Sequence, residues 1–186
     1  MQVFSENYRI KRIYSKIVNG DLLIPHYQRQ YAWDNAKIEL FLDSLNKGIF
    51  IGVFQFRRIF FDYNERYEII DGLHRIRTIF NILLGKGIYF NFDTCKFTLN
   101  PNDFDYSKFA EFDYVIQIIK EDGSLDIERS MILDRFYTEI RDIELVSVIY
   151  EGTDDEIQLA FDRINQAGVA FTPEFTLVQS ETKFEL

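Results

Sequence analysis

The segment that most constrains the fold is YEIIDGLHRIRTIF, residues 67–80, in which an apolar run passes through Asp71 and Gly72 straight into a helical pattern. The apolar residues that follow recur at helical spacing and are expected to pack inward: Ile76, Ile79, Phe80 and Leu83. A strand that passes directly into a helix leaves the first backbone N–H groups of that helix without internal partners. Together with the positive end of the helix dipole, these groups favour an anion. The sequence therefore predicts a strand–turn–helix unit with an anion site at the turn.

The turn itself carries the candidate ligand groups. Gly72 lacks a Cβ, so its backbone is suited to close approach by a phosphate. One face of the first two helical turns is expected to present His74, Arg75 and Thr78, and Arg77 adds a further positive charge nearby. Asp71 at the strand end fits two roles, that of a ligand for a divalent metal and that of an ordinary helix cap.

Two other segments combine polar and aromatic residues. In IPHYQRQYAW, residues 24–33, Gln28 and Arg29 stand among aromatic side chains, which suits an anion or base held against ring faces and equally an arginine that anchors the loop. In FDRINQAG, residues 161–168, Arg163 and Asn165 lie near a helix end, where they fit ligand contacts and also simple dipole and capping roles.

The remaining pattern predicts alternating helices and strands without an internal repeat, which indicates a single mixed α/β domain. Ser5 is expected to cap an opening helix, and Thr153 with Glu156 forms a capping box before a later one. Residues 103–115 fit either a loop or a helix. The expected helices are 5–19, 35–48 with Asp34 as N-cap, 73–85, 127–141, 153–168 and a last one from Thr172; the expected strands are 21–25, 52–61, 65–70, 88–92, 96–100 and 143–150.

Charge is divided unevenly along the chain. The net charge is −9, which argues against a protein that works mainly by binding nucleic acid. Residues 1–90 hold 13 Lys and Arg against 9 Asp and Glu, or +4, whereas residues 91–186 hold 8 against 21, or −13. An anionic ligand is therefore expected to bind the first half.

The sequence also indicates the compartment. The chain shows no apolar run of the roughly 18 residues that a membrane helix needs, and its start lacks the apolar core of a secretory signal. A single cysteine, Cys95, excludes an intrachain disulfide and fits a reducing environment. We expect a cytoplasmic protein with no membrane partner.

Taken in order, the motifs I-P-x-Y-Q-R-x-Y-x-W, I-D-G-x-x-R-x-x-T and F-x-R-I-N-x-x-G-V resemble the N-terminal domain of GmrSD-type restriction endonucleases. This ParB-like family is usually recognised by an Asp-Gly-Gln-Gln-Arg signature, and the resemblance covers residues from about 8 to 178. It implies a ParB/sulfiredoxin-like α/β fold, with a small mixed sheet flanked by helices, as one domain over 1–186. The α-helical region and C-terminal His-Asn-His nuclease of full-length members are not expected within these residues.

The resemblance also implies a function. Members studied hydrolyse nucleoside triphosphates with a divalent metal such as Mg²⁺ and act in defence against phage or modified DNA. Here Leu73 and His74 replace the two glutamines of the signature; His74 can donate a hydrogen bond or move a proton, whereas Leu73 can do neither. The expected catalytic residues are Asp71, His74 and Arg75, with Asp71 also as metal ligand; the expected nucleotide- and phosphate-binding residues are Gln28, Arg29, Gly72, Arg75, Arg77, Thr78, Arg163 and Asn165.

Two alternatives to a nucleotide-binding, NTP-hydrolysing regulatory domain stay open. In the first, the chain is a non-catalytic sensor or protein-interaction module whose acidic half docks another protein. In the second, its basic first half binds DNA directly, beside a nuclease domain or subunit in another chain. The sequence does not choose the nucleotide.

Overall fold

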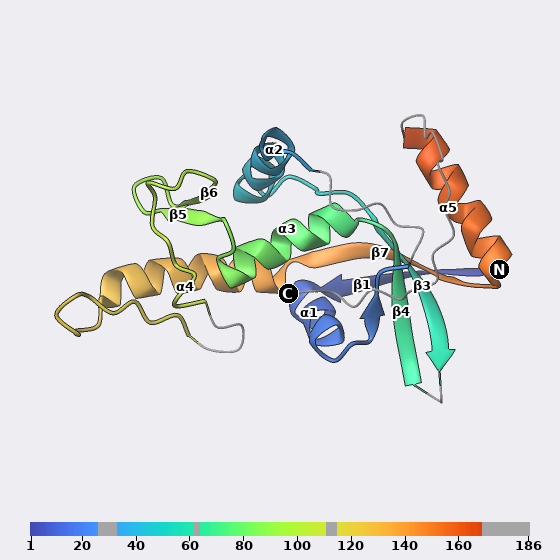
Figure 1. Cartoon of the computed structure of the whole chain (residues 1–186), viewed down its shortest axis with the longest axis horizontal. Coiled ribbons are helices and arrows are strands. Elements are labelled where there is room, and N and C mark those ends of the chain that lie inside the picture. Colours follow the sequence, from blue (N-terminus) through green and yellow to red (C-terminus); the bar gives the residue numbers. More distant parts are fainter. Residues whose placement is uncertain (26–32, 62–63, 111–114, 169–186) are drawn as a thin grey trace. The chain divides into compact units, whose positions relative to one another are not determined.

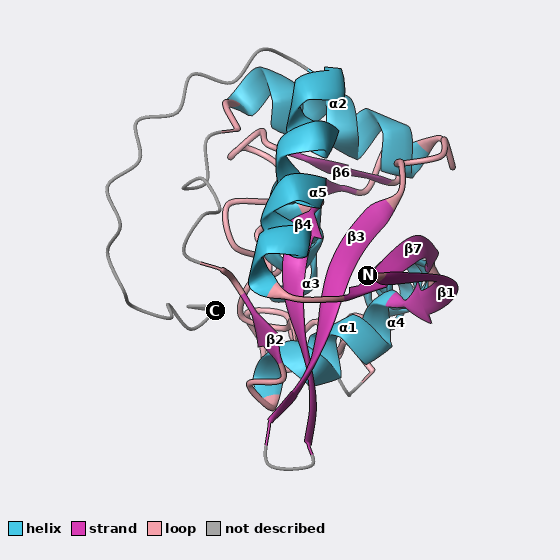
Figure 2. Ribbon diagram, turned by 90° about the vertical axis from the view of Figure 1, so that its right-hand side faces the viewer, coloured by secondary structure: helices cyan, strands magenta, loops and turns pink. Residues whose placement is uncertain are grey.

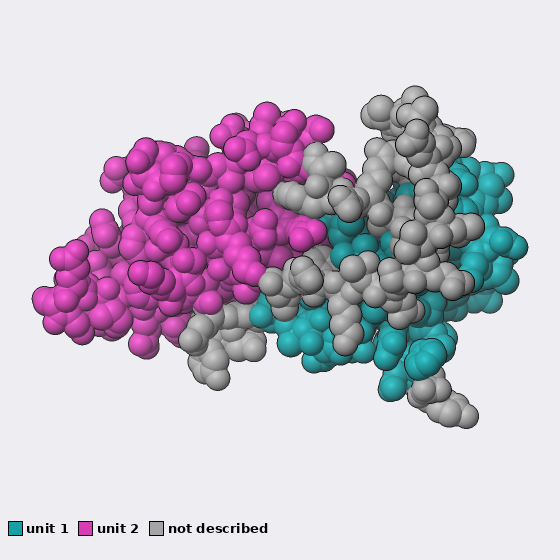
Figure 3. Space-filling view, viewed as in Figure 1, with its two compact units in different colours: residues 1–30, 52–73, 144–186 teal, residues 31–51, 74–143 magenta. Residues whose placement is uncertain are grey.

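The computed structural model describes residues 1–25, 33–61, 64–110 and 115–168 (Figure 1). The expected mixed α/β class is confirmed, because these residues form five helices, a five-stranded sheet and a two-stranded sheet. The chain divides into two compact units, coloured separately in Figure 3. Unit 1 comprises residues 1–30, 52–73 and 144–186, and unit 2 comprises 31–51 and 74–143. One domain over 1–186 stays a prediction.

The five-stranded sheet belongs to unit 1, in the order β1-β7-β3-β4-β2. Strand β7 pairs antiparallel with β1 and parallel with β3, while β4 pairs antiparallel with β3 and parallel with β2. Figure 2 shows β3 and β4 running side by side beyond the rest of the sheet. The strand bounds are β1 Gln2–Arg9, β2 Leu22–Leu23, β3 Phe54–Phe61, β4 Asn64–Asp71 and β7 Glu144–Glu151.

Two helices of unit 1, α1 (Ile10–Val18) and α5 (Asp154–Gly168), cover opposite faces of this sheet. Successive side chains of a strand point to opposite faces, so Tyr67 and Ile70 of β4 lie on different sides. Ile70 packs against two buried residues of α5, Ile157 and Phe161. On the other face Lys16 of α1 lies over the ring of Tyr67, 4.0 Å from its centroid.

Unit 2 is organised around α3 (Leu73–Leu84), whose inward residues Ile76, Ile79, Phe80, Ile82 and Leu83 are all buried. Two buried tyrosines complete the end of this helix: Tyr106 and Tyr137 donate hydrogen bonds to the carbonyls of Ile82 and Leu83. These bonds satisfy carbonyls that a helix end leaves without internal partners. The other elements are α2 Asn35–Asn46, α4 Ile127–Asp142 and the paired strands β5 Tyr89–Asn91 and β6 Lys96–Thr98.

Among the described residues, the structure corrects the expected opening helix. Residues 5–9 belong to β1 rather than to a helix capped by Ser5, and α1 begins only at Ile10. The spacing of Tyr8 and Ile10 fits both a strand and a helix, and pairing with β7 along the whole of β1 decides in favour of the strand. Local pattern cannot reveal a partner about 140 residues away.

Most other expected elements are confirmed, including their caps. The Asp34 side chain accepts a hydrogen bond from the backbone N–H of Lys37, at 2.9 Å. The capping box is present, since the Thr153 N–H donates to Glu156 Oε2 at 3.0 Å and the Glu156 N–H donates to Thr153 Oγ1 at 3.4 Å. The expected last helix from Thr172 lies outside the described residues. Among the described residues, no helix is long and apolar enough to cross a membrane.

Candidate functional site

The predicted strand–turn–helix unit is present. Asp71 is the last residue of β4 and pairs with Gln55 of β3. Gly72 follows with φ +101°, and α3 begins at the next residue, Leu73, which is only 4% exposed. Leu73 is thus a core residue, and this position of the signature presents no polar group to solvent. The short turn brings Asp71 to the N-terminal end of α3.

His74 is held by an aromatic neighbour that the sequence placed in another motif. Its imidazole stacks on the indole of Trp33, with ring centroids 5.7 Å apart and planes 16° from parallel. Trp33 in turn meets the ring of Phe41 on α2 edge-on, at 5.4 Å. Stacking fixes the plane of the imidazole and therefore the directions in which its two nitrogens can donate or accept. Trp33 therefore orients His74, whereas in the sequence it stands out only as part of an aromatic segment.

Arg75 has a structural contact as well as its predicted role. Its Nη1 donates a hydrogen bond of 2.8 Å to the carbonyl of Ile51, which precedes β3 by a few residues. The side chain is half-buried, and a guanidinium has five N–H donors in a planar fork. The bond to the Ile51 carbonyl engages one of these donors and orients the fork. Sequence spacing gave no signal for this contact.

Thr78 and Arg77 differ in exposure. Thr78 is 0% exposed, and its hydroxyl donates to the carbonyl of His74 one turn earlier, at 3.0 Å. Arg77 is half-buried. The Thr78 hydroxyl therefore lies on the buried side of α3, and its contribution to phosphate binding stays a prediction.

The third motif, residues 161–168, packs against the strand that leads to the turn. Phe161 of α5 is 3% exposed and contacts Ile70, the residue before Asp71. Arg163 is exposed on the same helix. Gln28, Arg29 and the side chain of Asn165 lie outside the described residues, so the structure does not place them beside the turn. The described part of the site is the sequence Asp71 to Arg75 with Trp33 and Ile51 as supports.

The sequence suggested Asp71 as a metal ligand, and this role stays a prediction. In the described ranges, no group of three or more His, Cys, Asp or Glu side chains gathers in a way that could hold a metal ion. Mg²⁺ commonly binds through one or two carboxylates and completes its shell with waters and substrate phosphates. A single carboxylate at the strand end fits that mode and does not fit a closed protein cage.

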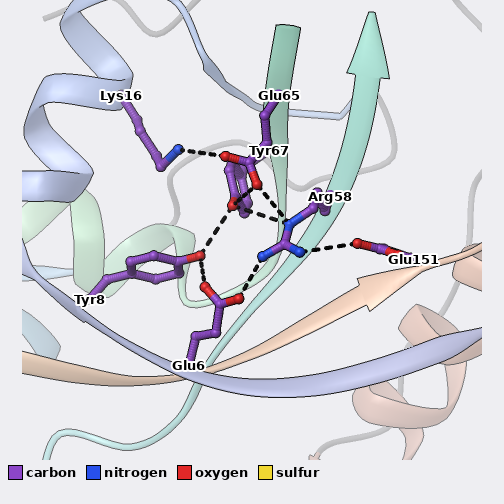
Figure 4. Close-up of polar contacts among 7 residues, drawn as sticks. All are labelled: Glu6, Tyr8, Lys16, Arg58, Glu65, Tyr67 and Glu151. Carbon is purple, nitrogen blue, oxygen red and sulfur yellow. Dashed lines mark hydrogen bonds and ion pairs between the residues drawn. The ribbon is translucent and has the colours of Figure 1, made fainter. Parts of the chain in front are cut away.

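A second polar cluster, which the local sequence pattern does not reveal, lies on the α1 face of the sheet (Figure 4). Arg58 of β3 stands at its centre, with Nη2 at 2.6 Å from Glu6 and Nη1 at 3.1 Å from Glu151. Its Nε lies 3.2 Å from the Tyr67 hydroxyl and 2.9 Å from Glu65. Four strands are tied together through this one guanidinium. The adjacent arginines of FQFRRIFF, inside a strand pattern, were the available signal.

The electrostatics of this Arg58 cluster are those of mutually satisfied charges. Burial by itself would lower the pKa of Arg58, but hydrogen bonds with Tyr67 and Glu6 outweigh it and raise the pKa overall. Burial raises the pKa of Tyr67, and its hydrogen bond to Glu65 raises it further. The hydrogen bond from Tyr8 lowers the pKa of Glu6, burial opposes this, and Arg58 lowers it again. The charges of this cluster are therefore paired with one another across the strands of the sheet.

Arg57 on the α5 face is paired in the same way. It donates to Asp154 at 2.6 Å, to the Gly152 carbonyl at 3.1 Å and to Glu68 at 3.2 Å. A surface pocket of about 470 Å³ adjoins both arginines and is lined by Arg57, Arg58, Ile59, Phe60, Glu151 and Gly152. Because carboxylates neutralise both guanidinium groups, this pocket is a poor anion site.

Comparison with known proteins adds the family. No curated protein matches the sequence significantly. The family described as GmrSD restriction endonuclease, N-terminal domain, matches residues 10–180, a range that contains all three motifs and nearly every element of both units. The chain therefore belongs to the family of GmrSD restriction endonuclease N-terminal domains, which associates it with restriction and phage defence.

Proposed function

We propose that the chain is a nucleotide-binding regulatory domain of a restriction or phage-defence system, and that the turn from Asp71 to Arg75 binds the phosphates of a nucleoside triphosphate. The observation that carries this proposal is the direct passage of β4 through Gly72 into α3, with Arg75 in the first turn of the helix. Helix N-termini attract phosphate through their backbone N–H groups and dipole. The planar fork of arginine matches pairs of phosphate oxygens.

Each residue of the turn has a chemical task in this proposal. Arg75 binds phosphate oxygens, and its bond to Ile51 holds the guanidinium in place. His74, oriented by Trp33, donates a hydrogen bond or moves a proton at the phosphates. Asp71 would hold a divalent cation such as Mg²⁺, which would supply positive charge to neutralise the phosphates and Lewis acidity for hydrolysis.

Titration calorimetry tests the binding. ATP, GTP, CTP and UTP, each with Mg²⁺, are titrated into the protein, and at least one is expected to bind. Arg75→Ala should abolish that binding, whereas Arg135→Ala should preserve it, because Arg135 is exposed on α4 and pairs only weakly with Glu139 at 3.7 Å. Absence of binding by all four nucleotides overturns the proposal.

Hydrolysis is a separate step of the proposal. Phosphate release above background, lost in Asp71→Ala while circular dichroism shows an intact fold, is the expected result. The burial of Leu73 favours a second candidate, a non-catalytic nucleotide sensor, because this position offers no group to orient an attacking water. Binding without phosphate release would favour the sensor. A gel shift with DNA that persists at moderate salt would instead favour direct DNA binding.

A further inference from the structure

The connector between α2 and β3, residues 47–53, is exposed at its centre and held at both ends. Its first residues close the end of α2, since the N–H groups of Gly48 and Ile49 bond to the carbonyls of Leu45 and Ser44 at 3.1 and 2.8 Å. Ile49 and Phe50 then turn their side chains to solvent, with 53% and 67% of their surface exposed. The connector therefore presents an adjacent pair of large apolar side chains to solvent.

Arg75 forms a hydrogen bond to the backbone of this connector from a distant part of the sequence. Its guanidinium donates to the carbonyl of Ile51, the residue after Phe50, across 24 positions of sequence. A hydrogen bond from a charged donor is stronger than one between neutral groups. The signature arginine is thus bonded to the backbone of the connector that carries the exposed Ile49–Phe50 pair.

We infer that Arg75 couples phosphate binding at the turn to the conformation of the α2–β3 connector. The guanidinium is planar and rigid, so a phosphate that fixes one edge of the fork also fixes the edge that bonds Ile51. Binding then restrains the Ile51 carbonyl and with it the backbone that presents Ile49 and Phe50. The inference rests on the proposed function. It adds that nucleotide binding makes the exposed apolar connector less mobile.

Hydrogen–deuterium exchange of the connector amides tests the coupling. Without ligand, Arg75→Ala should accelerate exchange in residues 47–53 roughly tenfold relative to the unmodified protein, because the bond to Ile51 is lost. Arg135→Ala, an arginine-to-alanine change in the same unit, should leave this exchange unchanged. With ATP, GTP, CTP or UTP and Mg²⁺, or with tripolyphosphate alone, exchange in the unmodified protein should slow several-fold.

A second variant perturbs the connector without touching the ligand groups. Gly52 has φ +89°, a conformation strained for any other residue, so Gly52→Ala displaces the neighbouring Ile51 carbonyl. We expect several-fold weaker nucleotide binding, although residue 52 supplies no ligand contact. Gly123→Ala is the matched control, because Gly123 also has a positive φ, +80°, and open space around it in a surface turn.

The outcomes separate the two ideas. No binding of any nucleotide overturns the proposed function and the coupling with it. Binding that requires Arg75 but leaves connector exchange unchanged, or equal effects of Gly52→Ala and Gly123→Ala on affinity, overturns the coupling and leaves the proposed function standing. Slower exchange on binding together with the difference between the two glycine variants supports both.

Discussion

Trp33 stacks on His74, with the two rings nearly parallel and their centroids 5.7 Å apart. Trp33 is the only tryptophan of the chain, so tryptophan fluorescence reports on the surroundings of His74 at the candidate site. Because indole emission depends on the groups packed against the ring, His74→Gln should change the emission of Trp33. The measurement is a steady-state emission spectrum at a single pH.

Arg135→Ala, which removes an exposed arginine of α4, should leave the emission unchanged. An emission spectrum that is the same in His74→Gln as in the unmodified protein would contradict the stacking of His74 on Trp33.

Loss of Arg58 should be costly for the fold. Arg58→Ala leaves the carboxylates of Glu6, Glu65 and Glu151 close together without their shared cation. Since these groups are partly exposed, we expect a loss of about 2–4 kcal/mol in the free energy of unfolding, somewhat below the value for a fully buried pair. Urea denaturation measures it. Arg135→Ala, which removes an exposed arginine, should change the same quantity by less than about 0.5 kcal/mol. Similar losses for both variants would contradict a central role for Arg58.

The tyrosines of the same cluster make stability sensitive to alkali. Burial raises the pKa of Tyr8 and of Tyr67 above the usual 10.0, and their hydrogen bonds to Glu6 and Glu65 add to the rise. The unfolded chain loses these protons first, so stability present below about pH 10 is lost as pH rises through the folded-state pKa values. Unfolding free energy measured from about pH 9 to 11 should therefore decrease.

Tyr67→Phe should flatten this alkaline decrease, because one of the two titrating groups is gone. At neutral pH the same variant should be less stable by about 1.5–3 kcal/mol, since charged partners lose a hydrogen-bond donor or acceptor. Tyr150→Phe, which removes a single bond to the neutral Gln55, should cost only about 0.5–1.5 kcal/mol. An unaltered alkaline slope in Tyr67→Phe would show that other groups cause it.

Gly85, which ends α3, should tolerate no side chain. Its φ is +63°, and a Cβ there would lie 2.6 Å from the Cα and 2.8 Å from the backbone nitrogen of Ser107. Gly85→Ala combines strain with a backbone collision and should cost about 3 kcal/mol by thermal or urea unfolding. Gly87→Ala shares the positive φ but meets nothing within 4 Å, so its cost should stay near about 1 kcal/mol. Equal costs would mean that the loop at Ser107 moves aside freely.

The sequence predicted elements whose causes are local. Helix starts were predicted from capping side chains whose hydrogen bonds span only three residues, namely Asp34, Thr153 and Glu156. The strand–Gly72–helix turn was likewise visible, because apolar spacing changes from strand to helix within a few positions. Strand β1 could not be predicted from local pattern, because its partner strand, Glu144–Glu151, lies far away in the sequence.

The same division applies to the candidate site. The consecutive residues Asp71 to Arg75 could be picked out as a group, because the chain itself holds them together. The residues that contact this group could not be predicted from the sequence. Trp33 is 41 positions from His74, and Ile51 is 24 positions from Arg75. The Arg58 cluster gathers side chains from residues 6 to 151, and no local pattern encodes such a gathering.

The position of β7 between β1 and β3 sets an order of events during synthesis. The first strand leaves the ribosome before any residue of its partner exists, and its neighbour in the sheet, Glu144–Glu151, is translated last of the five strands. Residues 74–143 form an uninterrupted part of unit 2 and emerge earlier. A nascent chain released before β7 would thus carry an unpaired β1 and a sheet that lacks the strand between β1 and β3, a species that chaperones or proteases would recognise.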